Sequence, residues 1–217
     1  MCADNKSYID TDLLYAWSED DLREQHQKRY LRHLKNAPGK VLEIGSGRGV
    51  MLRLMKEAGI PAYVLDSFED SVIYCKGKGL DVVHGDALSH LAQLPAGSLG
   101  GIFCAHVIEH MQPTQAIALI KESYRVLKPG SRFIIITPNP KDLRTSERFW
   151  LDITHVRPYP EKLLFVLMKK EGFDNIKSYE DGEPARNIFE KSAKALLKMW
   201  FMGFMFRGDL VVVADRS

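Results

Sequence analysis

A glycine-rich turn that follows the first apolar run constrains the fold of this chain more than any other sequence feature. Residues 41–44 are mostly apolar, Gly45, Gly47 and Gly49 follow at alternate positions, and residues 50–58 carry apolar side chains at a helical period. This pattern predicts a buried strand, a tight turn and a helix, which together are the first half of a βαβ unit. Glycines here let the backbone adopt positive φ angles or approach a ligand closely.

The residues around this turn indicate which ligand it accommodates. The last glycine of a dinucleotide-binding Gly-x-Gly-x-x-Gly pattern is replaced by Val50, and the Gly-Lys-Ser/Thr of a phosphate-binding loop is absent. Glu43 would repel a pyrophosphate but suits a cationic ligand. The next predicted strand ends in Asp66, where open α/β folds place the carboxylate that binds a ribose diol. The expected ligand is therefore a nucleoside that carries positive charge and no phosphate.

The turn resembles motif I of the class I S-adenosylmethionine-dependent methyltransferases, and later residues resemble other motifs of that family. Gly85-Asp86-Ala87 resembles the adenine site, although a helix N-cap is the alternative role for Asp86. Lys128-Pro129-Gly130 resembles the family's Leu-Lys-Pro-Gly-Gly turn, with Ser131 replacing the second glycine. The resemblance implies S-adenosylmethionine as the cofactor; another nucleotide-binding Rossmann domain is the alternative. The cofactor-binding residues that it implies are Glu43, Gly45, Gly47, Gly49, Asp66, Ser67, Asp86, Ala87 and His106.

Seven segments of the chain are predicted strands, and helical segments separate most of them. This alternation predicts an α/β fold with a mostly parallel sheet and helices on both faces. The resemblance implies a Rossmann-like, seven-stranded sheet whose last strand inserts antiparallel between the fifth and the sixth. The predicted strands are residues 41–44, 62–66, 80–84, 101–105, 132–137, 173–180 and 209–214. The predicted helices are residues 18–36, 50–58, 69–76, 113–127 and 160–172.

The length and composition fit a single domain. A chain of 217 residues with 45% hydrophobic residues has the size and composition of one soluble globular domain. We expect one methyltransferase domain over residues 1–217, with an N-terminal helical lid at 1–37 and a core formed by 38–180 and 208–215. A helical insert is expected at 184–207.

The net charge, the cysteines and residues 187–206 indicate which partners and which cellular location to expect. A net charge of +2 neither requires nor excludes nucleic acid, and we do not expect a nucleic-acid partner. Three cysteines without metal-type spacing, and an N-terminus without an apolar signal segment, indicate free thiols in the cytoplasm. Residues 187–206 combine lysines with Met, Trp and Phe. This segment is expected to pack as a cap or homodimer contact, or to lie at a membrane surface.

A group of histidines and acids carries the candidate chemistry. His106, Glu109 and His110 follow the fourth predicted strand at spacings that place them on one face of a helical turn. His155 follows the fifth strand, and the carboxyl ends of parallel strands are where open α/β folds bind ligands. We predict a divalent metal ion on these four residues, with Mn, Co, Fe or Zn favoured over Mg because the set is rich in imidazole. The alternatives are a metal-free site in which His110 or His155 is a general base, and a purely structural role.

Two methyltransferase groups resemble this arrangement. The ubiquinone-pathway O-methyltransferases, of the methyltransferase type 11 group, carry Glu-His after strand four and Thr-His before a helix start like that at residues 160–163. The small-RNA 3′-terminal 2′-O-methyltransferases hold a divalent metal with Glu-x-x-Glu-His and a later histidine. His106 stands where that motif has its first glutamate.

The resemblance implies methyl transfer, with His110 and His155 as catalytic residues. An Asn/Asp-Pro-Pro-Tyr/Phe motif, which nitrogen methyltransferases of this fold often carry after strand four, is absent. We therefore expect O-methylation of a small-molecule, glycan or lipid acceptor, through a hydroxyl of a sugar or glycolipid or through a prenylated phenol. The alternatives are an RNA 3′-terminal 2′-O-methyltransferase and a non-catalytic, S-adenosylmethionine-binding partner subunit.

Overall fold

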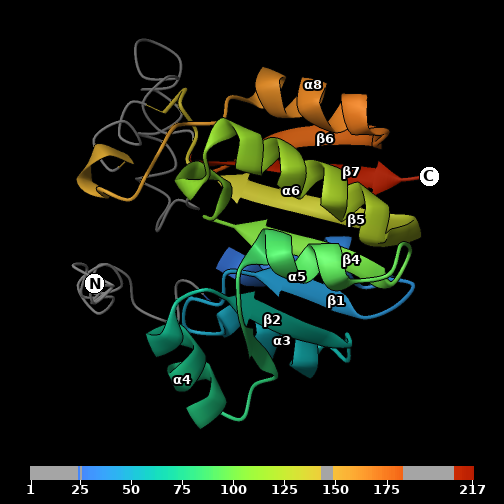
Figure 1. Ribbon diagram of the computed structural model, residues 1–217, viewed down its shortest axis with the longest axis vertical. Helices are drawn as coiled ribbons and strands as arrows, with labels where there is room; N and C mark the ends of the chain where they lie inside the picture. Colours follow the sequence, from blue (N-terminus) through green and yellow to red (C-terminus); the bar gives the residue numbers. More distant parts are fainter. Residues whose placement is uncertain (1–23, 25, 143–148, 183–207) are drawn as a thin grey trace, which may run out of the picture.

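A seven-stranded sheet organises the computed structural model, which describes residues 24, 26–142, 149–182 and 208–217 (Figure 1). The strand order is β3-β2-β1-β4-β5-β7-β6. β1 to β5 are parallel to one another, whereas β7 runs antiparallel between β5 and β6, as predicted. The strands are β1 (Val41–Ile44), β2 (Ala62–Asp66), β3 (Val82–His84), β4 (Leu99–Ala105), β5 (Leu127–Thr137), β6 (Asp174–Asp181) and β7 (Asp209–Arg216).

Helices cover both faces of this sheet, as predicted. The helices, with η marking 3₁₀ helices, are η1 (Arg29–His33), α3 (Val50–Glu57), α4 (Glu69–Gly77), α5 (Ala87–Gln93), η2 (Ile108–His110), α6 (Pro113–Val126) and α8 (Glu161–Glu171). α5, α6 and α8 pack on one face, where Leu119 and Leu164 share a core cluster (Figure 1). η1, α3 and α4 pack on the other, through residues such as Met51 and Val72. Because both faces are covered, every residue of β1 is buried.

Local sequence signals set the ends of the two helices that flank the site. Pro113 occupies the first helical position of α6, and Gln112 and Gln115 form a capping box there. α8 follows Pro160 and ends at Gly172, whose φ of 104° suits a glycine C-cap. The predicted helices 113–127 and 160–172 are therefore confirmed to within a residue at each end.

The predicted N-terminal helix and one predicted turn are wrong in part. The chain is α-helical at residues 26–28, but it tightens into the 3₁₀ helix η1, so the helix does not continue to Asn36. The side chains of Arg29 and Tyr30 both donate hydrogen bonds to Asp181 of β6, and these tertiary contacts hold the tighter turn. The segment 128–130 is an irregularity within β5 rather than a turn before it. β5 begins before this segment because buried Leu127 already pairs with Leu99 of β4.

Several predictions concern residues outside the described ranges. The lid at 1–37 lies largely outside them, and the insert at 184–207 and its membrane or dimer contact lie wholly outside. Among the described residues, no helix is both long enough and apolar enough to cross a membrane. Cys75 and Cys104 are free thiols, as predicted, and both are buried.

Candidate functional site

The glycine turn after β1 has the backbone geometry that its sequence predicts. Gly45, Gly47 and Gly49 all have positive φ angles, of 85°, 48° and 71°. A Cβ on Gly45 would lie 2.6 Å from Cγ2 of Val107, and a Cβ on Gly49 would lie 2.3 Å from Cδ1 of Leu80. Close packing therefore requires glycine at two of these positions, in addition to the backbone conformation. The contact with Val107 also joins the turn to the segment after β4.

Asp66 ties the end of β2 to the glycine turn. One carboxylate oxygen accepts hydrogen bonds from the backbone N–H and the hydroxyl of Ser46, at 2.7 and 2.6 Å. The other accepts from the N–H of Phe68 at 2.8 Å. Asp66 is only 6% exposed, and these three donors replace the hydrogen bonds to water that its carboxyl group loses on burial. Its contact with a ribose diol stays a prediction.

Glu43 is a buried carboxyl group beside the same turn. Within the described part of the chain, its Oε2 atom is buried without a hydrogen-bond partner. Burial and the nearby charge of Asp66 raise the pKa of Glu43 well above its usual value. A hydrogen bond with the backbone of Leu52 lowers this pKa but does not outweigh the other two effects. A buried carboxyl with an open oxygen would gain from a cationic ligand, which agrees with the ligand class that the sequence predicts.

Three further predicted cofactor residues follow β2 and β3, whereas His106 follows β4. Ser67 is exposed directly after Asp66, and Ala87 is buried at the start of α5. Asp86 caps α5, because its Oδ1 atom accepts hydrogen bonds from the N–H and the hydroxyl of Ser89, both at 2.8 Å. Asp86 is therefore an N-cap, and its contact with an adenine stays a prediction.

His106 departs from the helical face predicted for it. Its φ of 55° lies in the left-handed region, and η2 begins only after it. Its Nδ1 lies 3.3 Å from Oε1 of Glu109, and its Nε2 lies 3.3 Å from Oδ2 of Asp209. Desolvation opposes the charge on this ring, although the side chain is 51% exposed, and the carboxylates of Asp209 and Glu109 outweigh it and raise the pKa of His106 well above its usual value. His106 is thus a cation between two carboxylates. The predicted helical turn does not include His106, although its ring contacts Glu109.

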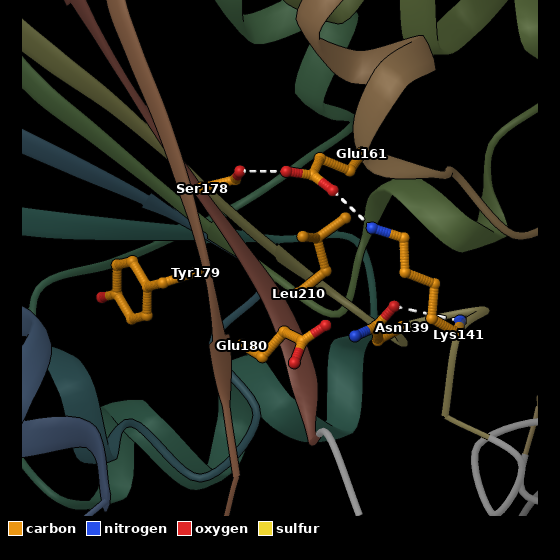
Figure 2. Close-up of a pocket in the computed structure, with 7 residues that line it drawn as sticks. All are labelled: Asn139, Lys141, Glu161, Ser178, Tyr179, Glu180 and Leu210. Carbon is orange, nitrogen blue, oxygen red and sulfur yellow. Dashed lines mark hydrogen bonds and ion pairs between the residues drawn. The ribbon is translucent and has the colours of Figure 1, made fainter. Parts of the chain in front are cut away.

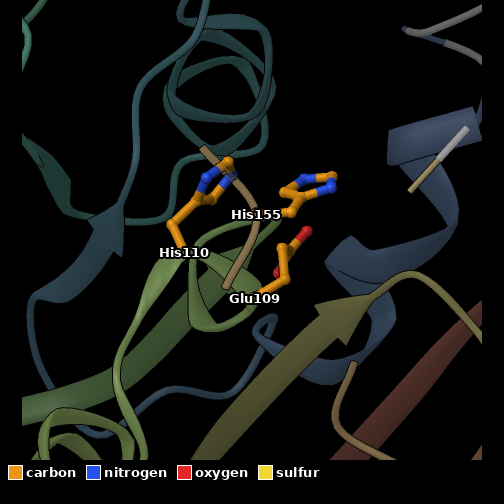
Figure 3. A group of neighbouring side chains, drawn as sticks. All are labelled: Glu109, His110 and His155. Carbon is orange, nitrogen blue, oxygen red and sulfur yellow. The ribbon is translucent and has the colours of Figure 1, made fainter. Parts of the chain in front are cut away.

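Three of the four predicted metal ligands do lie together. Glu109, His110 and His155 each offer one ligand atom, and these atoms lie within 4.8 Å of one another (Figure 3). The two imidazole rings are 4.6 Å apart between centroids. Glu109 is fully buried, and its Oε2 accepts a hydrogen bond from the hydroxyl of Thr137 at 3.1 Å. Whether these residues bind a metal ion stays a prediction.

The segment after β5 is held against η2 by backbone and ring contacts. The N–H of Val156 donates to the carbonyl of Glu109 at 2.8 Å. The ring of His155 stacks on Phe149 at 4.5 Å, and its Nδ1 donates to the carbonyl of Phe149 at 2.7 Å. These contacts bring His155 to His110, although the two residues belong to segments after different strands.

His110 has the protonation state that a base or a metal ligand needs. Its burial lowers the pKa of the imidazole, and the neighbouring His155 adds to this effect, whereas Glu109 opposes it. Together these effects lower the pKa of His110, so its ring is neutral near pH 7.

A cavity of about 300 Å³ lies between the end of β5, the start of α8 and the strands β6 and β7 (Figure 2). Nζ of Lys141 lies 2.6 Å from Oε2 of Glu161, whose other oxygen accepts a hydrogen bond from Ser178. The buried side chain of Asn139 also lines the cavity. None of the residues predicted to bind the cofactor or a metal lines it. Sequence reasoning missed this cavity because its walls come from elements that are distant in the chain.

Comparison with known proteins identifies the family. A family model described as a methyltransferase domain matches residues 18–178, and the chain belongs to this family. The chain is 29% identical over 153 residues to a protein of Mycolicibacterium smegmatis described as a probable S-adenosylmethionine-dependent methyltransferase. That match covers 69% of this chain and only 58% of the relative, so the chain spans little more than half of the relative's length.

Solved structures agree with this family. An S-adenosylmethionine-dependent methyltransferase from Archaeoglobus fulgidus is 26% identical and superposes with a TM-score of 0.82, covering 95% of this chain and 100% of that chain. A protein from Pyrococcus horikoshii is 18% identical with a TM-score of 0.66, covering 97% and 95%, and supports the fold alone. The predicted fold and the predicted methyltransferase family are therefore confirmed.

Proposed function

We propose that this methyltransferase transfers the methyl group of S-adenosylmethionine to a hydroxyl oxygen held at Glu109, His110 and His155. The observation that carries the proposal is the convergence of one carboxylate and two imidazoles after β4. Open α/β folds bind ligands at this end of the sheet. Attack on the sulfonium methyl group must be in line and at close range, so positioning supplies much of the rate. A hydroxyl must also lose its proton, and a neutral imidazole is a suitable base.

The same three side chains suit a divalent metal ion. Oε1 of Glu109 is buried and lies 3.3 Å from Nδ1 of His106, and an ion would add to the compensation that this ion pair gives a buried carboxylate oxygen. Two imidazoles with one carboxylate favour Mn²⁺, Fe²⁺, Co²⁺ or Zn²⁺ over Mg²⁺. When bound, such an ion would supply Lewis acidity that lowers the pKa of the acceptor hydroxyl.

Exposed apolar side chains near the histidines support an amphiphilic acceptor. Trp150, Leu151 and Ile153 are 70%, 73% and 79% exposed. All three follow Phe149 within four positions, and Phe149 stacks on His155. Exposed apolar groups beside a reactive site favour contact with a lipid chain or a membrane surface. A glycolipid or a prenylated phenol combines such a chain with a reactive hydroxyl, and either is the acceptor class that we propose.

The test is incubation of the enzyme with isotope-labelled S-adenosylmethionine and a fractionated cell extract, followed by mass spectrometry. We expect a labelled methyl ether in the lipid fraction, and its loss with His155→Ala. The triple variant Trp150→Ser, Leu151→Ser, Ile153→Ser should lose labelling of lipids. The matched control Phe165→Ser, Val166→Ser removes exposed apolar groups of α8 and should keep it. Label found on nitrogen or in RNA would contradict the proposal.

Chelation separates the metal from the general base. If an ion assists the reaction, a chelator should abolish turnover and spare S-adenosylmethionine binding, and Mn²⁺ or Co²⁺ should restore turnover better than Mg²⁺. An unchanged rate after chelation, with the rate still lost in His110→Ala, would assign the histidine as a base instead.

A further inference from the structure

The hydroxyl of Thr154 connects His110 to a carboxylate that has no assigned role. Oγ1 of Thr154 lies 2.6 Å from Oδ1 of Asp152 and 2.8 Å from Nδ1 of His110. The same Asp152 oxygen also accepts the backbone N–H of Thr154 at 2.9 Å, which fixes the turn. The three side chains therefore form a continuous chain of hydrogen bonds that ends at one of the two converging imidazoles.

The directions of these hydrogen bonds follow from the available protons. Oδ1 of Asp152 accepts both the backbone N–H and the hydroxyl of Thr154, and a carboxylate oxygen in this position only accepts. The single proton of the Thr154 hydroxyl is thus directed at Asp152. The oxygen then faces His110 with a lone pair, and only an N–H at Nδ1 completes a hydrogen bond.

We propose that Asp152 and Thr154 are positioning residues that fix His110 as its Nδ1–H tautomer. The Nε2 atom of His110 then carries a bare lone pair, which can take a hydroxyl proton or bind an ion. This inference rests on the proposed function and deepens it.

A different contact holds the ring of His155. Its Nδ1 lies 2.7 Å from the carbonyl of Phe149, which only accepts, so Nδ1 carries a proton. Its Nε2 lies 3.7 Å from Oδ2 of Asp152, so Asp152 lies beside His155 and also accepts from the threonine that contacts His110. Partners of this kind orient an imidazole and fix its tautomer, and their loss typically costs about 10–100-fold in metal affinity or activity.

The tautomer is measured by long-range ¹H–¹⁵N spectra of the imidazoles in chelator-treated, ¹⁵N-histidine-labelled protein. We expect His110 of the wild type to be protonated at Nδ1. Thr154→Val keeps the shape of the side chain but removes the hydroxyl, so both tautomers should become populated, and Asp152→Ala should do the same. Thr154→Ser should restore the wild-type spectrum. Thr114→Val, the same change at an exposed position of α6, is the matched control and should alter nothing.

Methyl transfer is the second readout. Thr154→Val should lower the rate by roughly 10–100-fold while S-adenosylmethionine affinity is unchanged, and Thr154→Ser should recover the rate. An Nε2–H tautomer in the wild type, or an Nδ1–H tautomer that persists in Thr154→Val, would overturn the inference. The spectra need no acceptor, so a wild-type enzyme that methylates no hydroxyl would refute the proposed function without changing the tautomer.

Discussion

Replacing Gly45 with alanine tests the packing of the glycine turn against the segment that carries the site. Gly45 has a φ of 85°, and a Cβ there would lie 2.6 Å from Cγ2 of Val107. A left-handed conformation costs an L-residue roughly 1–2 kcal/mol. Forcing one carbon into packed space costs roughly 1–3 kcal/mol more, and β-branched Val107 has little rotamer freedom to give way. Gly45→Ala should therefore lower the free energy of unfolding by about 2–5 kcal/mol in urea denaturation.

Gly59 provides the matched control for this substitution. It has a φ of 68°, and no atom lies within 4 Å of the position that a Cβ would take. Gly59→Ala should thus cost only the backbone strain, roughly 1–2 kcal/mol. Adding Val107→Ala to Gly45→Ala should remove the steric clash, giving a coupling energy of about 1–3 kcal/mol. Equal losses in the two alanine variants, or no coupling with Val107→Ala, would refute the reasoning.

Two further predictions concern the buried carboxyl groups that are predicted to contact the cofactor. Asp66→Ala should weaken S-adenosylmethionine binding by about 1.5–3 kcal/mol, the scale of hydrogen bonds to a charged group, and unchanged affinity in calorimetry would reject the assignment. Glu43 has a raised pKa, so it holds its proton at pH values where an ordinary glutamate is ionised. A cationic ligand favours the ionised form of Glu43, so ligand binding should release a proton and the affinity should rise with pH. Glu43→Gln should abolish this proton release. Calorimetry in buffers of different ionisation enthalpy measures the number of protons released. Because the pKa is raised, the contribution of Glu43 to stability should be present at low pH and lost as pH rises through that pKa, which urea denaturation at several pH values would detect.

Much of the fold could be predicted because the chain marks its elements locally. β1 and β2 match their predicted bounds, since each is an apolar run that ends at a glycine turn or at an acid. α5 was not predicted, because it has only seven residues and its N-cap, Asp86, resembles a cofactor residue. The 3₁₀ helix η1 depends on side-chain contacts with Asp181, which lies far along the chain. Local patterns carry no information about such contacts.

The candidate site could be predicted only in part, for a related reason. His155 was expected near His110 because the carboxyl ends of neighbouring parallel strands share one edge of the sheet. The spacing of His106 suggested a helical face, but one left-handed residue before η2 turns its ring toward Asp209. The contact between Thr154 and His110 joins residues that are 44 positions apart. Only the folded arrangement brings these two residues together.

The most direct test of the central claim is the single-turnover rate of methyl transfer to the lipid-fraction acceptor in His110→Ala and His155→Ala. His90→Ala is the matched control, since His90 contacts Tyr63 and lies outside the converging group. We expect a fall of about 10²–10⁴-fold in the first two variants, unchanged affinity for S-adenosylmethionine, and a wild-type rate in the control. Wild-type rates in His110→Ala and His155→Ala would contradict it.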